Sequence, residues 1–495
     1  MAAEEQPSRK SYFFGKGYRD LGNTVAGAWV RNFQSIGKYK AHISNLDFDG
    51  GKIIAVFGFI VNGLAILAVF IFGSIITLLM TLANVVILLG FMLLVYIAFS
   101  LIWTVDRIYL IKNRIFTACH ECKEKSLIPT YLCPQCGAQH TNLTPGVYGI
   151  LKHTCTGNGS GPCGAKLPAV FFNGRRELQS ECPHCGHPLM DRETVPLCIP
   201  VIGGRSVGKT AFITAFSRDF IEVVAGKKKW EILPYNSEKS AIYREILKDY
   251  NTGSTRMTER SLDRNKASSV SFSFFIKAPE FNPERLIHIY DIAGEVFTDN
   301  NENEVQKQYE YCHGIVFMLD PFAIPAVRYK YEHLLSPEDI AGIGSADING
   351  IINSFLNKLR EVTGLSEQKM SSVPLALVIA KIDSGGLDNE IGKTAVTRLM
   401  NSGSAGYDDF YDTQDYLCRK FLVDNGMEGF LNNITLKFRR NRFFACSAIG
   451  HPRDKGAYRP EGVMPVVQWL FNNADAAMLK AWNDVTFSAK PFALN

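Results

Sequence analysis

The longest feature in the pattern of hydrophobic and polar residues is a run from Ile53 to Val105 that contains no charged residue. As one continuous helix this run would extend about 80 Å, whereas the hydrocarbon core of a bilayer is about 30 Å thick. The run therefore predicts two transmembrane helices joined by a tight turn, either at Gly73 and Ser74 or between Thr81 and Asn84. The alternative is a pair of buried helices in a soluble core, but such helices normally carry a polar stripe, which this run lacks.

Shorter apolar runs in the second half of the chain have the length of strands. They span residues 197–202, 286–292, 314–320, 373–380 and 443–446. They predict a mostly parallel sheet flanked by helices over residues 193–495. Pro200 is unusual in the first run, because proline rarely occurs inside a central strand. The preceding chain divides into an N-terminal segment (1–52), the apolar hairpin (53–105) and a cysteine-rich region (115–192).

Eight of the 12 cysteines lie between Cys119 and Cys185, mostly in C-x-x-C pairs, which favours metal ligation over disulfides. A first structural zinc site is predicted from four regularly spaced thiolates: Cys119, Cys122, Cys133 and Cys136. A second site, with a less regular first half, is predicted from Cys155, Cys163, Cys182 and Cys185. Nearby histidines are alternative ligands: His120, His140, His153, His184 and His187. Four thiolates close each tetrahedral site, so neither site is predicted to be catalytic.

The segment that follows the first predicted strand matches the phosphate-binding pattern G-x-x-x-x-G-K-[ST]. Its residues are Gly203, Gly204, Arg205, Ser206, Val207, Gly208, Lys209 and Thr210. In such a loop the backbone amides surround the phosphates, and the next helix adds its partial positive charge. Lys209 is predicted to contact the β- and γ-phosphates, and the Thr210 hydroxyl to bind Mg²⁺. The domain is therefore predicted to be an α/β P-loop NTPase.

Two motifs after later strands indicate which nucleotide binds. Asp291 begins a D-x-x-G motif, in which its carboxylate would hold Mg²⁺ through water and the Gly294 amide would contact the γ-phosphate. Lys381 and Asp383 form a K-x-D motif. Its carboxylate accepts hydrogen bonds from N1 and N2 of guanine, whereas adenine offers no such pair of donors. Ala380 stands where this motif usually has Asn or Thr, so one brace of the loop is missing.

A last motif completes the order that GTPases share. Ser447 and Ala448 follow the final predicted strand, like the loop whose amide contacts O6 of guanine. With these motifs, residues from about 195 to 475 resemble the TRAFAC class of P-loop GTPases, in particular a bacterial double-GTPase group associated with conflict and antiphage systems. Members of that group can carry zinc ribbons ahead of the GTPase domain. The resemblance implies a GTP-hydrolysing, Mg²⁺-dependent switch that acts in signalling or antiviral defence.

The remaining catalytic groups are assigned less directly. Thr258 is favoured as the switch I threonine that binds Mg²⁺, with Thr252 and Thr255 as alternatives. Glu295 follows the D-x-x-G motif and is either a group that orients or deprotonates the attacking water or a solvated turn residue. Three arginines are either arginine fingers in cis or part of a solvated surface: Arg256, Arg260 and Arg264.

Charge and composition restrict the class of protein and its expected location in the cell. A chain of 495 residues with 46% hydrophobic and 20% charged residues is expected to be folded, and its net charge of +5 does not favour nucleic-acid binding. No signal peptide is predicted in the first 50 residues, and basic residues flank the apolar run on both sides. We therefore expect a multi-pass protein of the bacterial inner membrane with its N-terminus, zinc ribbons and GTPase domain in the cytoplasm.

Two rival functions stay open at this stage. One is a nucleotide-binding scaffold that does not hydrolyse, and the other is a nucleotide-gated effector that acts on the membrane. A protein partner or an oligomer is expected in each case.

Overall fold

The computed structural model describes residues 6–47, 51–113, 115–119, 122, 124–159, 161–189, 193–235, 237–253, 271–291, 312–344, 348–363, 371–403, 406–451 and 457–487. The chain forms two compact units. One comprises residues 1–113 and 127–192, and the other comprises residues 114–126 and 193–495.

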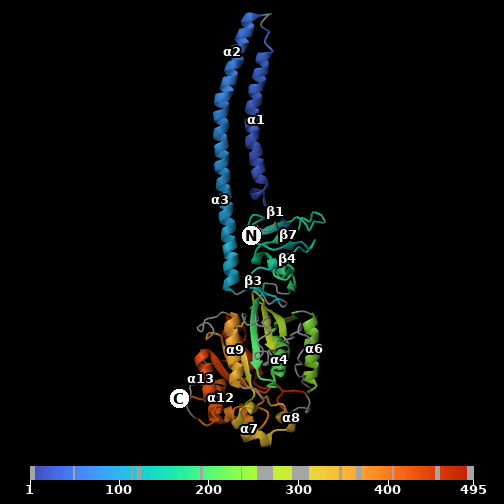
Figure 1. The fold of residues 1–495 in the computed structure, drawn as a ribbon, viewed down its shortest axis with the longest axis vertical. Coiled ribbons are helices and arrows are strands. Elements are labelled where there is room, and N and C mark those ends of the chain that lie inside the picture. Colours follow the sequence, from blue (N-terminus) through green and yellow to red (C-terminus); the bar gives the residue numbers. More distant parts are fainter. Residues whose placement is uncertain are drawn as a thin grey trace. The chain divides into compact units, whose positions relative to one another are not determined.

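The apolar run forms one continuous helix (Figure 1), which consists of α2 (Lys52–Ala68), the π-helical turn η2 (Val69–Gly73) and α3 (Ser74–Lys112). The predicted hairpin of two transmembrane helices is therefore wrong. The polar residues proposed for its turn donate hydrogen bonds to carbonyls of their own helix instead. Thr81 donates to the carbonyl of Thr77 at 2.6 Å, and Asn84 donates to the carbonyl of Met80 at 2.9 Å. Because these side chains bond to their own helix, they do not end it.

A hairpin does form, but earlier in the chain, where α1 (Lys16–Ser44) runs antiparallel to the long helix. The Asn32 amide donates to the Gly73 carbonyl in the π-helical turn at 3.0 Å. Further towards the start of α1, the Tyr18 hydroxyl lies 2.6 Å from the sulfur of Met92. Gly73 thus provides a contact for α1 rather than a turn.

The long helix, residues 52–112, keeps most of its apolar surface exposed. Only 6% of its most apolar 18-residue window is buried, and by length and composition the helix is a candidate membrane span. Near the end of this helix the exposure changes: Asp106 is buried and forms an ion pair with Arg175 at 2.9 Å. The second oxygen of Asp106 accepts a hydrogen bond from the Phe171 amide at 2.9 Å. The first charge after the apolar run therefore fixes the helix to the cysteine-rich part of the same unit.

The cysteine-rich part consists of short antiparallel strands. One sheet has the order β1-β6-β7, from Ser8–Arg9, Lys152–Cys155 and Lys166–Pro168. Another has the order β5-β4-β8-β9, from Gln139–His140, Thr130–Leu132, Ser180–Glu181 and Pro188–Leu189. Short helical turns are η1 (Tyr12–Phe14), η3 (Phe171–Asn173) and η4 (Arg175–Glu177). The pair β2 (Thr117–Ala118) and β3 (Lys125–Ser126) belongs to the second unit.

Within the described residues the second unit contains a seven-stranded sheet in the order β11-β12-β13-β10-β14-β15-β16. These strands are Glu231–Pro234, Ser271–Lys277, Arg285–Asp291, Val195–Gly203, Ile315–Leu319, Leu375–Ile379 and Asn441–Ala445. β12 is antiparallel to its neighbours, whereas the pairs from β13 to β16 are parallel. The predicted α/β sheet, mostly parallel and flanked by helices, is confirmed.

Helices cover both faces of this sheet, so its central strands are buried on both sides. The first face carries α4 (Lys209–Asp219), η5 (Phe220–Val224), α5 (Ala225–Lys228), α6 (Ser237–Asn251), α14 (Val463–Ala474) and α15 (Ala476–Ala481). The second carries α7 (Pro325–Tyr331), α9 (Ile348–Thr363), α12 (Phe410–Asp424) and α13 (Glu428–Lys437). Shorter elements are η8 (Pro321–Ala323), η9 (Glu332–Leu334), α8 (Pro337–Ala341), η10 (Leu387–Asn389) and α11 (Lys393–Met400).

Pro200 lies inside β10, yet the sheet tolerates it. The continuous pairing of β10 with β14 covers only Val201 to Gly203, directly after the proline. On the other side, Pro200 faces Tyr290 of β13 in a parallel ladder. The missing N–H therefore falls between an isolated bridge from Cys198 to Cys312 and the continuous ladder with β14.

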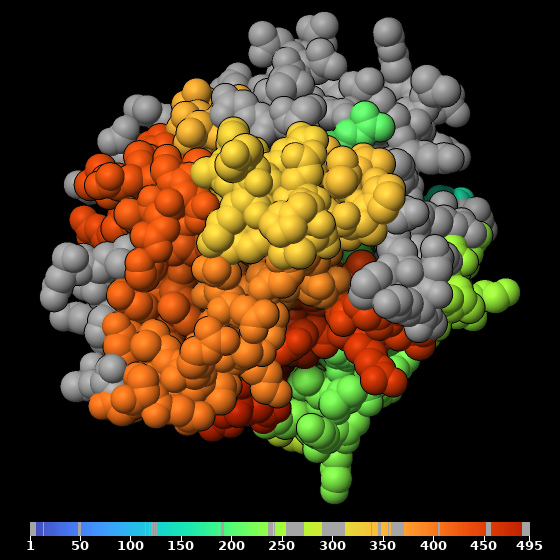
Figure 2. Space-filling view, turned by 90° about the horizontal axis from the view of Figure 1, so that it is seen from below, coloured from blue at the N-terminus to red at the C-terminus, as the bar shows by residue number. Residues whose placement is uncertain are grey.

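The parallel strands end at one edge of the sheet, where ligands bind in open α/β folds. α7 and α8 follow the end of β14 and mark this edge at the bottom of the domain in Figure 1. Seen from below in Figure 2, the yellow surface of α7 and α8 borders the orange surface formed by the segment after β15. The motifs identified in the sequence all follow strands that end here.

Candidate functional site

The loop between β10 and α4 has the backbone of a phosphate-binding loop. Ser206 and Gly208 adopt left-handed conformations, with φ of 59° and 95°. Among the described residues, the amides of Ser206, Val207 and Gly208 donate no hydrogen bond. A side chain at Gly203 would meet the carbonyl of Met318 at 2.5 Å, so only glycine fits there. The loop thus presents unpartnered amides at the start of a helix, which suits an anion.

Lys209 lies over this loop. Its Nζ donates to the carbonyls of Gly203 at 3.1 Å and Gly204 at 2.9 Å. These bonds hold the ammonium group next to the amides that would bind phosphate. Thr210, the predicted Mg²⁺ ligand, is the second residue of α4 and is half-buried.

Asp291 is the last residue of β13, paired in register with Val201 two residues before the P-loop. The structure therefore brings the backbone of Asp291 close to the phosphate-binding loop. Gly294, Glu295 and Thr258 lie outside the described residues, as do Thr255 and the three candidate arginine fingers. Thr252 lies within them, and its hydroxyl donates to the carbonyl of Asp249 at 2.8 Å.

Asp383 and Ser447 meet at the ends of β15 and β16. Oδ1 of Asp383 is buried and has no hydrogen-bond partner in the described part of the chain. Burial raises the pKa of this carboxyl group, and a hydrogen bond with the Ser447 side chain counteracts the rise. A buried carboxylate oxygen without a donor is costly unless a ligand supplies one. The site therefore fits a ligand that supplies an N–H donor, as guanine does.

The loop that contains Asp383 lacks the Asn or Thr brace, because Ala380 is fully enclosed and offers only its backbone. The Ala380 amide donates to the Leu319 carbonyl at 2.9 Å. The Ile382 amide donates to the Cys446 carbonyl at 3.4 Å. Together with the Ser447 hydroxyl, these bonds hold the loop without the side-chain brace, whose absence the sequence indicates.

Asp320, which the motif analysis did not assign, holds Lys381 in place. The Lys381 ammonium contacts Oδ2 of Asp320 at 2.6 Å, and the other oxygen of Asp320 caps η8 by accepting from the Phe322 amide at 3.0 Å. Lys381 itself has a φ of 57°, in the left-handed region. The sequence signal that could have identified Asp320 is its position as the last residue of a predicted parallel strand.

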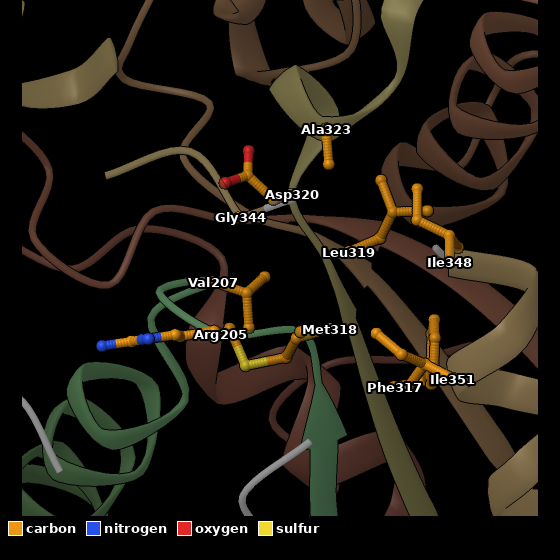
Figure 3. A pocket seen from close by; sticks show the side chains of 11 residues that line it. Arg205, Val207, Phe317, Met318, Leu319, Asp320, Ala323, Gly344, Ile348 and Ile351 are labelled. Atoms are coloured by element: carbon orange, nitrogen blue, oxygen red, sulfur yellow. The ribbon is translucent and has the colours of Figure 1, made fainter. Parts of the chain in front are cut away.

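A small cavity lies beside the P-loop (Figure 3), lined mainly by apolar side chains such as Val207, Phe317 and Ile348. In Figure 3 the Arg205 side chain points away from the other lining side chains. The volume of the cavity is about 20 Å³, which is room for a water molecule rather than a nucleotide. A nucleotide would therefore lie on the open edge formed by the loops.

Four thiolates of the first unit converge as a zinc site requires. They come from Cys133, Cys136, Cys155 and Cys163. The Sγ atoms of Cys133 and Cys163 are 3.6 Å apart, as are those of Cys136 and Cys155. A tetrahedral site with zinc–sulfur bonds of about 2.3 Å has edges of about 3.8 Å, so these sulfurs fit zinc.

The sequence-based grouping of the cysteines was wrong. The second cluster consists of Cys119, Cys122, Cys182 and Cys185, so the two sites interleave along the chain. The knuckle at Cys136 is held to the segment that follows Cys155, because the Asn158 amide donates to the Cys136 carbonyl at 2.8 Å. In both clusters the sulfur atoms lie within 4.8 Å of one another, which is consistent with two structural zinc sites.

Histidine is not a ligand in either cluster as far as the chain is described. His140 and His153 have other partners: Ser8 Oγ at 3.1 Å and the Thr144 carbonyl at 2.9 Å. Burial lowers the pKa of His153 to about 4, which keeps the ring neutral.

No curated protein is significantly similar to this chain. A family comparison matches the part of the second unit that begins in β10 and ends in α12, and it includes the P-loop, Asp291 and the K-x-D motif. The match suggests that this domain binds and hydrolyses GTP. The family is described as Double-GTPase 2, and residues 197–412 match its model.

Proposed function

We propose that this protein is a membrane-attached GTPase that binds GTP with Mg²⁺ and hydrolyses it as a molecular switch. The observation that carries the proposal is Oδ1 of Asp383, buried without a donor at the same sheet edge as the P-loop. The proposal agrees with the family match to residues 197–412.

In this proposal each predicted residue has one task. The amides of the P-loop and the Lys209 ammonium bind the phosphates, while Thr210 and Asp291 hold Mg²⁺. Asp383 accepts the two guanine donors beside Ser447 and Ala448. Glu295 orients the attacking water, and Thr258 completes the coordination of Mg²⁺. The metal supplies charge for the phosphates, and the chain supplies their position.

Replacing Asp383 by asparagine tests the choice of base. The carboxylate makes two charge-assisted hydrogen bonds to guanine, each worth about 1.5 to 3 kcal/mol, so the variant should bind GTP at least about 100-fold more weakly. It should gain affinity for xanthosine triphosphate, whose carbonyl at position 2 accepts a bond from the asparagine amide. Competition against labelled GTP measures both effects.

The control is Asp424→Asn, an exposed aspartate on α12 that pairs with Lys420. It should leave both affinities unchanged. If excess ATP displaces labelled GTP from the natural chain as well as GTP does, Asp383 does not read guanine and the proposed function fails. Binding without any release of phosphate would favour the non-hydrolysing scaffold.

We further propose that the helix of residues 52–112 is inserted in a membrane, with the zinc sites and the GTPase domain on the cytoplasmic side. The exposed apolar surface of that helix supports insertion, and the zinc-site thiolates, which must stay reduced, support the cytoplasmic side. The resemblance to conflict-system GTPases supports a role in bacterial signalling or antiviral defence.

Membrane insertion predicts how the chain fractionates. The natural chain should stay with membranes in alkaline carbonate and be released by detergent. Leu79→Arg with Leu94→Arg should release a large fraction into carbonate, because each arginine at the centre of a membrane helix costs about 2.5 to 3.5 kcal/mol. These leucines are 61% and 63% exposed. The control Leu436→Arg, on the GTPase domain at 83% exposed, should not change fractionation. A natural chain that carbonate extracts fully would contradict insertion.

A further inference from the structure

A buried tyrosine contacts the loop that is proposed to recognise guanine. Tyr250 lies in the last turn of α6, and its hydroxyl donates to the carbonyl of Ala448. Its side chain is 1% exposed, so water does not compete for this bond. The bond joins α6 to a loop that comes 198 positions later in the chain.

This bond completes the fixation of one peptide unit, the one between Ala448 and Ile449. Tyr250 holds its carbonyl end. At the other end, the Ile449 amide donates to Ser447 Oγ at 3.3 Å. The Gly450 amide donates to the same oxygen at 2.7 Å.

The fixed loop leaves one amide available. Within the described residues the N–H of Ala448 donates no hydrogen bond, although the peptide unit that follows it is held at both ends. The Ser447 backbone is paired with Glu461 in both directions, at 3.0 and 2.8 Å. Ala448 therefore lies between two restrained positions, with its N–H ready for an acceptor on a ligand.

The ring of Tyr250 is itself restrained from two sides. The ring of Tyr458 packs edge-on with the centroids 5.0 Å apart, and the Arg218 guanidinium lies 5.2 Å from the centroid of Tyr250. Arg218 also donates to the Tyr458 carbonyl at 3.3 Å. Burial raises the pKa of Tyr250, so its hydroxyl stays protonated and remains a donor. A phenylalanine ring would pack equally well at this position. The hydroxyl of Tyr250 adds only the contact with the loop.

We propose that Tyr250 is a positioning residue for base recognition: its hydroxyl holds the loop at Ser447 and Ala448 so that the Ala448 amide faces O6 of guanine. The inference rests on the proposed GTP specificity and adds a residue that lies outside the GTPase motifs. It also places the end of α6, shortly before the segment predicted to contain the switch I threonine, in contact with the base loop.

The test is the variant Tyr250→Phe, assayed with GTP and with the triphosphate of 2-aminopurine riboside, which lacks O6. Loss of one hydrogen bond that orders the loop should weaken GTP binding about five- to tenfold. Binding of the 2-aminopurine nucleotide should stay within about twofold. That analogue also lacks the N1 proton, but this difference affects the natural chain and the variant equally.

The matched control is Tyr243→Phe on the same helix. The ring of Tyr243 packs against the ring of Phe272, with the centroids 5.3 Å apart. This variant should leave both affinities unchanged. If Tyr250→Phe weakens the binding of both nucleotides equally, or leaves the affinity for GTP unchanged, the positioning role is overturned. If the natural chain itself prefers GTP no more than ATP, the proposed function fails and this inference falls with it. If the natural chain prefers GTP over ATP and the Tyr250→Phe variant binds GTP equally well, only the role of Tyr250 is refuted.

Discussion

Replacing Lys209 by alanine is expected to abolish GTP binding or turnover while the domain stays folded. The ammonium group donates to the carbonyls of Gly203 and Gly204, and both carbonyls belong to its own loop. Water can solvate these carbonyls once the side chain is gone, so little stability is lost. The phosphates, in contrast, lose the positive charge that neutralises them at closest range. Release of phosphate from GTP and equilibrium binding of labelled GTP measure the two effects.

A lysine of the same domain outside the sheet edge serves as the control. Lys227 on α5 is exposed, and Lys227→Ala should keep natural rates and affinity. The melting temperatures of both variants should match that of the natural chain. Unchanged hydrolysis in Lys209→Ala would refute the assignment of the P-loop, whereas a large drop in melting temperature would give Lys209 a structural role instead.

The GTPase sheet was predictable because its signals are local. The residues of β15 alternate between the two faces, with Ala376 and Val378 on one core and Leu377 and Ile379 on the other. A strand buried on both faces reads as a continuous apolar run. The same locality made the P-loop recognisable, since its glycines and lysine lie within eight consecutive positions. Site residues that depend on distant contacts, such as Asp320 and Tyr250, left no comparable pattern.

The hairpin prediction failed because it inferred a turn from length alone. A bilayer limits how far one membrane helix can extend, but it does not break the helix. Breaking a helix requires a residue that disrupts the backbone, and neither Thr81 nor Asn84 does so when its side chain bonds to the preceding turn. Gly73 is likewise helical, in the π-helical turn that contacts Asn32. The antiparallel partner was α1, whose charged residues had excluded it from the apolar run.

The zinc ligands could be predicted, but not their division between two ions. Spacing shows which cysteines can form knuckles, as at Cys133, where the Gly137 amide donates to the Cys133 carbonyl at 2.8 Å. Which pairs share an ion depends on contacts between segments that are distant in the sequence. The hydrogen bond from the Asn158 amide to the Cys136 carbonyl is such a contact, and no local spacing encodes it.

Double substitutions of cysteine should distinguish the interleaved sites from sequential ones. The natural chain should contain two zinc ions. Cys133→Ser with Cys155→Ser removes ligands from one cluster and should leave one ion per chain. Cys155→Ser with Cys182→Ser removes a ligand from each cluster and should leave none. Sequential grouping predicts the reverse for the two variants.

The effect should be large, because structural zinc contributes about 10 kcal/mol or more to the folding of such small regions. Metal analysis of protein purified under reducing conditions gives the zinc content, and resistance to a chelator shows whether the remaining ion is held as tightly as in the natural chain. The control Cys418→Ala, on α12 in the GTPase core, should keep both ions. If the first double variant loses both ions and the second keeps one, the thiolates are grouped in sequence order.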